Sequence, residues 1–245
     1  MSNIKTYFFL ILCILFWSVN FVIGRFIKED MTPLELAFFR WAFVFLMVLP
    51  ILVLRYKHIF NSFKKNWFIL TLLAFLGITS FNTILYFGLS ATTSTNALII
   101  NSTIPLLILL VSFLILKQNI SSNQVFGIVL STFGVIFLIL KADIDNIFTL
   151  KFNSGDILVI LSSATWAFYS VLVKFKPKDL TSFEFFSSIV AIGFMLLMLI
   201  YLYQGYQWAH ELDLLKDNYL IFLYLSIFAS ISSYYLWHYG IEKTF

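Results

Sequence analysis

Charged residues are scarce in this chain of 245 residues, where Asp, Glu, Lys and Arg make up 11% and hydrophobic residues 61%. A soluble domain carries about 25% charged residues. Too little polar surface is available to cover a water-soluble core of this size, so lipid must be the solvent for most of the chain. The composition therefore predicts an integral membrane protein, with the lipid bilayer as a partner of most of its surface.

Cysteine and histidine are also scarce. Cys13 is the only cysteine, which excludes an internal disulfide, and His58, His210 and His238 are scattered along the chain. Metal sites and membrane-embedded catalysis both need clustered Cys, His, Asp or Glu side chains, so we predict no metal, no cofactor and no catalytic residue. Basic residues form no run, which argues against nucleic acid as a partner. His58 and His210 are expected in connecting loops.

Apolar stretches fill the chain instead, and each approaches the length of about 20 residues that a helix needs to cross the hydrocarbon. The eight predicted spans are 5–25, 34–54, 67–88, 96–116, 123–140, 156–174, 183–203 and 219–241. Short connectors leave no room for a soluble domain. The fold class expected is therefore an all-α integral membrane protein.

The second group of spans repeats the first. With Trp17 placed on Trp166, an offset of 149 residues, ten identities fall within positions 11–45. Apolar matches are common by chance in such a chain, but polar and aromatic matches in one register are not. Those matches are Trp17/Trp166, Asp30/Asp179, Thr32/Thr181 and Glu35/Glu184. At an offset of 152 the third span aligns with the eighth, with Gly88 on Gly240.

The distribution of Lys and Arg predicts the orientation, because cytoplasmic segments carry an excess of them. With the N-terminus inside, cytoplasmic segments hold ten of the 16 basic residues and outer segments hold five, while Arg40 lies within a span. The equivalent spans that begin near Tyr7 and Asp156 are separated by five spans, which is an odd number. The second copy is therefore inverted relative to the first, an arrangement typical of transporters that work by alternating access.

We predict an inverted repeat of five-helix units, with eight transmembrane helices present of an expected ten. Residues 1–145 form the first repeat (spans 1–5), and residues 150–245 form an incomplete second repeat (spans 6–8). The alignment stops where the first copy continues for two more spans. A fragment of a ten-span protein is the favoured explanation, and a shortened natural variant is the alternative.

Four segments carry a resemblance to a known family. They are WSVNFVIGR at 17–25, TPLELAFFRW at 32–41, YFGLSATTSTNA at 86–97 and NQVFGIVLSTFGVIFL at 123–138. In order and spacing they resemble the EamA family of drug/metabolite transporters. The resemblance implies ten helices in two inverted repeats, a central cavity, and export of amino acids or other small metabolites across the bacterial inner membrane.

Arg40 is the strongest candidate for solute binding, because a charge within the membrane is costly and is a functional hypothesis by default. A guanidinium that faces the cavity would attract a solute carboxylate. Two plainer explanations stay open: Arg40 reaches the outer interface, or it pairs with Glu35. Its counterpart in the second copy is Ile189, so the charge belongs to one copy only.

The other cavity candidates are aromatic or polar side chains near mid-helix or at a helix break, where transporters tend to bind solute. Pro105 lacks an N–H and predicts a break after Asn101. His238 titrates near neutral pH and is a candidate proton carrier. Helix packing and interhelical hydrogen bonds are the alternative role of each candidate. The candidates are Trp17, Asn20, Arg40, Asn82, Tyr86, Asn101, Thr103, Pro105, Trp166, Tyr169, Tyr234 and His238.

The sequence thus predicts a multi-pass secondary transporter, with a cytoplasmic N-terminus, that moves a small organic solute by alternating access. A truncated non-transporting membrane fragment is the alternative, and an integral-membrane enzyme is less favoured. Gly127, Ser131 and Gly134 run along one face of their helix. Small residues at this spacing predict close helix packing or a homodimer, and the choice between them is left open.

Overall fold

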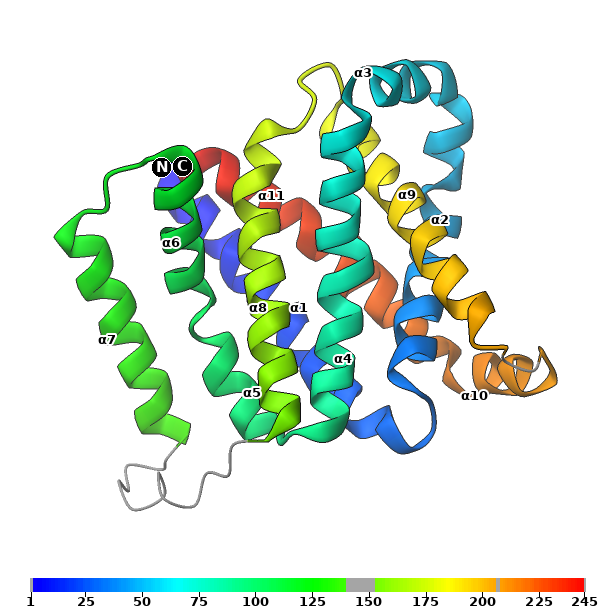
Figure 1. Cartoon of the computed structure of the whole chain (residues 1–245), viewed down its shortest axis with the longest axis horizontal. Coiled ribbons are helices and arrows are strands. Elements are labelled where there is room, and N and C mark those ends of the chain that lie inside the picture. The colour runs from blue at the N-terminus through cyan, green and yellow to red at the C-terminus, as the bar shows by residue number, and fades with distance from the viewer. Residues whose placement is uncertain (1, 140–152, 206–207, 245) are drawn as a thin grey trace.

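A computed structural model describes residues 2–139, 153–205 and 208–244, and these residues form helices and turns without a strand (Figure 1). The predicted all-α membrane fold is confirmed. Seven stretches of the described residues are long and apolar enough to span a membrane. They are Ile4–Phe26, Pro33–Leu54, Tyr56–Ala91, Ser94–Leu116, Ser154–Phe175, Ser182–Tyr203 and His210–Ile241.

Several predicted spans consist of more than one helix. The helices before the gap at 140–152 are α1 (Ser2–Phe26), η1 (Ile27–Glu29), α2 (Pro33–Leu54), α3 (Tyr56–Ala74), the π-helix η2 (Phe75–Ser80), α4 (Phe81–Ala91), α5 (Ser94–Asn101), α6 (Ile104–Leu116) and α7 (Ser122–Ile139). Those after it are α8 (Ser154–Leu172), η4 (Val173–Phe175), α9 (Ser182–Tyr203), α10 (Trp208–Ser226), the π-helix η5 (Ile227–Ser232) and α11 (Ser233–Thr244).

Helix α7 occupies the place of the fifth predicted span, although it is not among the seven stretches. Figure 1 shows it beside α6, with the start of α1 and the end of α11 at the same end of the bundle. A chain that returns to its starting side crosses an even number of times, which is consistent with α7 as an eighth span. That span stays a prediction, and the predicted boundary between 145 and 150 lies outside the described residues.

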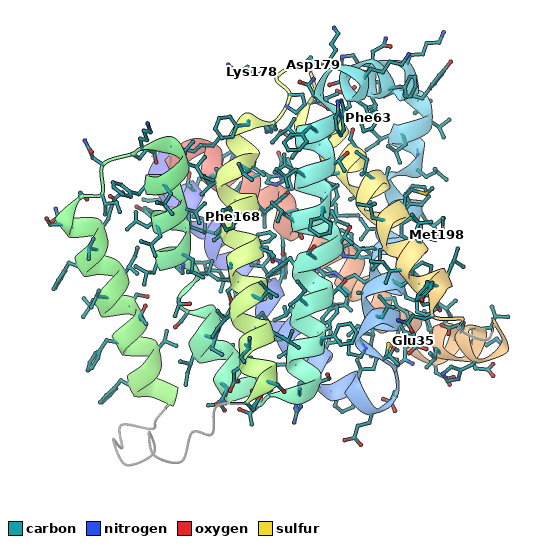
Figure 2. All side chains as sticks on the ribbon, in the orientation of Figure 1. Glu35, Phe63, Phe168, Lys178, Asp179 and Met198 are labelled. Atoms are coloured by element: carbon teal, nitrogen blue, oxygen red, sulfur yellow. The ribbon has the colours of Figure 1, made fainter. Side chains whose placement is uncertain are left out.

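Equivalent helices run in opposite directions. In Figure 1, α1 is antiparallel to α8, α2 to α9, and α4 to α11. Both α2 and α9 begin with a capping box, in which Thr32 or Thr181 exchanges hydrogen bonds with Glu35 or Glu184. Figure 2 shows Glu35 at one end of the bundle, and at the other end Asp179, in the loop that leads into α9. The same helix start is therefore built twice, at opposite ends.

Each capping glutamate also meets a histidine from the other half of the chain. Nε2 of His210 lies 4.0 Å from Oε1 of Glu35, and Nδ1 of His58 lies 3.2 Å from Oε1 of Glu184. The two histidines are 152 residues apart and the two glutamates 149 apart, which are the offsets of the repeat. Both histidines lie in helices, α3 and α10, so the expectation that they lie in loops is wrong.

Buried contacts between helices follow the same two offsets. Sγ of Cys13 donates to the carbonyl of Ser233 at 3.3 Å, and Oγ of Ser162 donates to the carbonyl of Phe81 at 3.2 Å. Cys13 corresponds to Ser162, and Phe81 corresponds to Ser233. The carbonyls that accept lie beside the π-helices, where the normal helical hydrogen bonds are displaced.

Glycines set the distance between the closest helices. A Cβ on Gly155 of α8 would lie 2.7 Å from the backbone nitrogen of Thr92, so the backbones of α4 and α8 touch at this point. A Cβ on Gly88 would lie 2.7 Å from Val159, and its counterpart Gly240 meets Leu10 in the same way at 2.5 Å. Leu10 itself corresponds to Val159.

The small-residue face of α7 behaves differently. A Cβ on Gly127 or Gly134 would meet no atom within 4 Å. The part of the chain that the structure describes therefore does not pack against these glycines, and the prediction of close packing is wrong within one chain. The homodimer alternative stays a prediction.

We expect Gly155→Val to destabilise the protein, because overpacking at a rigid contact costs about 1–3 kcal/mol and the neighbour here is backbone that cannot yield. The measurement is thermal unfolding in detergent, read as a drop of several degrees in Tm. Gly134→Val, which adds the same side chain in open space, serves as the control. Equal Tm values for the two variants would contradict the close α4–α8 contact.

Candidate functional site

A central cavity of about 330 Å³ lies where the helices of the two halves meet. Its walls come from α1, α4, α5, α6, α7, α8 and α11. The residues that line it are Ile14, Trp17, Ser18, Asn20, Phe21, Phe81, Asn82, Leu98, Asn101, Ser102, Ile104, Pro105, Ser131, Val135, Trp166 and Trp237. None of these described lining residues carries a charge. The cavity suits an amphipathic solute with a large apolar part.

Three tryptophans form the apolar wall. The ring of Trp17 meets Trp166 edge-on, with centroids 5.1 Å apart and an interplanar angle of 88°. The third ring, Trp237, lies 5.5 Å from Trp17 and 5.9 Å from Trp166. Nε1 of Trp17 donates to the carbonyl of Ala229 at 3.0 Å, and Nε1 of Trp237 donates to Oγ of Ser170 at 3.2 Å. These bonds hold the rings of Trp17 and Trp237 in place, whereas Trp166, with 1% of its surface exposed, is fixed by the aromatic rings packed around it.

The break predicted at Pro105 forms another part of the wall. Helix α5 ends at Asn101 and α6 begins at Ile104, and Asn101 and Pro105 both line the cavity. Thr103 does not line it, because its hydroxyl turns back to donate to the carbonyl of Ile100 at 2.6 Å. The break thus brings an amide to the cavity, while Thr103 satisfies the local backbone.

Arg40 is fully buried, with 1% of its surface exposed, and it is not among the lining residues. Its donors contact Ser230 Oγ at 2.7 Å, Ala229 O at 2.9 Å, Asn82 Oδ1 at 2.7 Å, Tyr86 OH at 2.8 Å and Asn20 Oδ1 at 3.2 Å. It neither reaches the interface nor forms an ion pair with Glu35, so both plainer explanations are wrong. The expectation that Arg40 faces the cavity is also not met. Arg40 contacts Asn20 and Asn82, and these two residues line the cavity.

Four other candidates lie behind the wall as well. Tyr86 donates to Oδ1 of Asn20 at 2.7 Å, and the counterpart pair, Tyr169 and His238, joins OH to Nε2 at 2.7 Å. The hydroxyl of Tyr234 donates to the carbonyl of Gly77. All of these tyrosines and His238 are buried, and none lines the central cavity. Their contacts match the packing alternative, and a proton-carrying role for His238 stays untested.

A second cavity adjoins the first on the side where the chain begins. It has a volume of about 640 Å³ and shares Pro105 and Trp237 with the central cavity. We call it the vestibule. Tyr7, Lys174 and Ile241 are among its lining residues, and all three lie at helix ends on the side predicted to be cytoplasmic. The vestibule therefore lies next to the central cavity, on the side of that end.

At the opposite end of the described bundle lies a hydrogen-bonded cluster around Asp156, here called the clasp. Asp156 is fully buried and begins α8. Its Oδ1 accepts from the hydroxyl of Thr92, and its Oδ2 accepts from Nδ2 of Asn96 at 3.1 Å and from the backbone N–H of Asn153 at 2.8 Å. The clasp ties α8 to the loop between α4 and α5, beside the contact at Gly155. In the repeat, Asp156 corresponds to Tyr7, which lines the vestibule.

Some cavity residues were not predicted. Trp237 supplies the third ring, but the repeat register pairs it with Leu85, so no repeated match marked it. Ser18 and Ser131 are small and lie in strongly apolar helices, where no local signal separates a cavity side chain from a packing one. Six predicted candidates do line the cavity, namely Trp17, Asn20, Asn82, Asn101, Pro105 and Trp166. Among the described residues, no group of three His, Cys, Asp or Glu could hold a metal ion.

Curated proteins similar to this chain are transporters by name. An uncharacterized transporter of Archaeoglobus fulgidus is 28% identical over 98% of this chain and 81% of its own length. The uncharacterized transporter YyaM of Bacillus subtilis is 25% identical over 99% and 79%. An S-adenosylmethionine uptake transporter of Rickettsia prowazekii is 28% identical over 71% and 56%. No solved structure matches the chain significantly.

The family comparison covers nearly all of the sequence. The model of the EamA-like transporter family matches residues 4–140 and 153–244, which include the wall of the central cavity, the vestibule and the clasp. The resemblance expected from the four sequence segments is confirmed. The chain belongs to the EamA-like transporter family.

Proposed function

We propose that the protein is a secondary transporter that carries a small organic metabolite, such as an amino acid or related solute, across the bacterial inner membrane by alternating access. One observation carries the proposal. A central cavity with an aromatic wall lies next to a vestibule at one end of the bundle, while the clasp and the close contact at Gly155 lie toward the other end. Such an arrangement is expected of a transporter that faces one side of the membrane.

An inverted repeat supplies the second conformation. We propose that residues 1–145 and 150–245 correspond, because helix directions, capping boxes, π-helices and buried contacts recur at two constant offsets. Exchange of the conformations of the two halves would close the vestibule and open the clasp.

The lining favours a solute that joins a planar aromatic group to a polar group. The rickettsial relatives are named for S-adenosylmethionine, which has both features, so this compound belongs in any panel of solutes tested. We propose export as the direction, which is what the family resemblance implies, although the names of those relatives denote uptake. An enzymatic role finds no support in the uncharged lining, and a non-transporting fragment is the alternative that an assay must separate.

The first experiment is counterflow of radiolabelled aromatic solutes and S-adenosylmethionine in proteoliposomes, followed by efflux from preloaded cells to test the direction. Trp17→Ala is expected to reduce movement of the transported solute by about tenfold or more, because a ring that contacts the solute is lost. Trp67→Ala is the control, because the ring of Trp67 lies on the surface of the helix bundle, 58% exposed, and away from the cavity. Movement of no solute in the panel, or equal losses in both variants, would contradict the proposal.

The clasp generates a second prediction. Asp156→Ala removes an acceptor of three hydrogen bonds, so the outward-open state gains population. In a Cys13→Ser background, Phe21→Cys in the cavity wall should react several-fold faster with a membrane-impermeant thiol reagent added outside. Asp213→Ala removes an exposed carboxylate that contacts Lys216 at 3.3 Å and should leave the rate unchanged. An unchanged rate in Asp156→Ala would show that the clasp does not hold the outer side closed.

The orientation is a third prediction. With a cytoplasmic N-terminus, Asp30 lies outside and Asn61, an exposed residue of α3, lies inside. In the Cys13→Ser background, an impermeant maleimide should label Asp30→Cys in intact cells, but Asn61→Cys only after permeabilisation. The reverse pattern would invert the orientation and would place the vestibule at the outer face.

A further inference from the structure

The polar part of the cavity is organised by a residue that does not touch it. Arg40 extends from α2, and every donor group of its guanidinium has an acceptor in the protein. No described carboxylate pairs with it. A guanidinium carries donors and no acceptor, so a side-chain amide that faces Arg40 must present its oxygen.

That rule determines how Asn20 is oriented. Its Oδ1 accepts from Nη1 of Arg40 at 3.2 Å and from the hydroxyl of Tyr86 at 2.7 Å. An amide oxygen has two lone pairs, and both are occupied. Rotation of the amide by half a turn would lose both bonds and place its N–H groups against the donors of Arg40.

The amino group of Asn20 is therefore left for the cavity. Asn20 is 98% buried, since 2% of its surface is exposed, and it lines the central cavity. Among the described residues, none accepts a hydrogen bond from its Nδ2. Nδ2 is not one of the fully enclosed side-chain atoms without a partner, so it keeps accessible surface at the cavity, where a bound acceptor would complete its hydrogen bonds.

Asn82 repeats the arrangement. Its Oδ1 accepts from Arg40 at 2.7 Å, and its Nδ2 donates to Tyr234 at the long distance of 3.4 Å. An amide nitrogen carries two hydrogens, so one of them stays free. Arg40 thus holds the oxygens of two lining amides; Nδ2 of Asn82 is directed to Tyr234, and Nδ2 of Asn20 is left for the cavity.

The charge of Arg40 acts in the same direction. Its guanidinium is surrounded by neutral acceptors, so its positive field is not cancelled locally and extends into the uncharged cavity. The counterpart residue is Ile189, and the counterpart of the Asn20–Tyr86 pair is Tyr169–His238. The donor arrangement therefore exists in one half of the protein only.

We propose that Asn20 binds the carboxylate or carbonyl oxygen of an aromatic solute through its Nδ2, and that Arg40 is a positioning residue for Asn20 and not a direct ligand. The aromatic part of the solute lies against Trp17, Trp166 and Trp237. This inference rests on the proposed transport function and names the polar group that the cavity selects.

The test is a binding assay on the purified full chain in detergent, with tritiated indole-3-acetate, which has a carboxylate, and unlabelled tryptamine, which has an amine. The wild type should prefer the carboxylate by about tenfold or more, because a donor site rejects a solute without the matching acceptor. Asn20→Asp keeps the contacts to Arg40 and Tyr86 but aims an oxygen at the cavity, so the preference should be lost or reversed. Asn66→Asp, the same change outside the cavity, should leave it unchanged.

Arg40→Lys separates positioning from direct charge attraction. A lysine keeps the charge but has no planar fork to hold two amides, so the preference should fall while indole itself still competes. A preference retained in Arg40→Lys would overturn the positioning role. Should this variant not fold, Tyr86→Phe removes one of the two donors to Asn20 and should weaken the preference, whereas a direct ligand role for Arg40 predicts no change.

The proposed function and this inference can fail separately. If neither probe binds, or if the wild type shows no preference for indole-3-acetate, the assignment of Asn20 is overturned. Counterflow of other solutes in the same preparation would then still support transport. Conversely, binding with the expected preference, but without movement of any solute in proteoliposomes, would uphold the site and contradict transport.

Discussion

The structure depends on how one buried cation is accommodated. Burying a guanidinium away from water costs several kcal/mol unless its donors find acceptors, and Arg40 finds them on three elements besides its own helix. Asn20 comes from α1, Asn82 and Tyr86 from α4, and the carbonyl of Ala229 from the π-helix η5. The π-helical turn makes that carbonyl available, because it displaces the regular hydrogen bonds of the helix. Arg40 therefore joins both halves of the chain at their centre.

Around this centre the two halves are alike in framework and different in chemistry. Helix starts, glycine contacts and serine or cysteine bonds recur at the offsets of 149 and 152 residues, and they concern how helices pack. The differences lie where solute would bind or a gate would close. In the alignment of the repeat, Arg40 corresponds to Ile189, and Asp156 corresponds to Tyr7. In the proposed function, packing similarity would let the halves exchange conformations, and the polar differences would give the cavity a selectivity that a symmetric one would lack.

The ends of the bundle follow from the same differences. At one end, Gly155 lets two backbones touch, and the buried Asp156 gathers donors from α5 and the loop before it. At the other end, the corresponding residues are Thr6 and Tyr7, and Tyr7 lines the vestibule. Burying a carboxylate is costly unless several donors form hydrogen bonds with it. The end with Asp156 therefore requires the arrangement of loop and helix that supplies these donors, and the end with Tyr7 has no such requirement.

Composition and periodicity determined much of this protein without a structure. The lipid environment made long apolar helices obligatory, so the spans and the break at Pro105 could be predicted from local sequence. The repeat drew attention to Trp17 and Trp166, which do meet. Tertiary structure alone decided that Arg40 lies behind the cavity wall, that Trp237 completes that wall, and that Asp156 is buried among donors from α5 and the loop before it. These outcomes depend on the rotation of each helix about its axis and on contacts between residues as much as 220 positions apart, and a local pattern of apolar residues encodes neither.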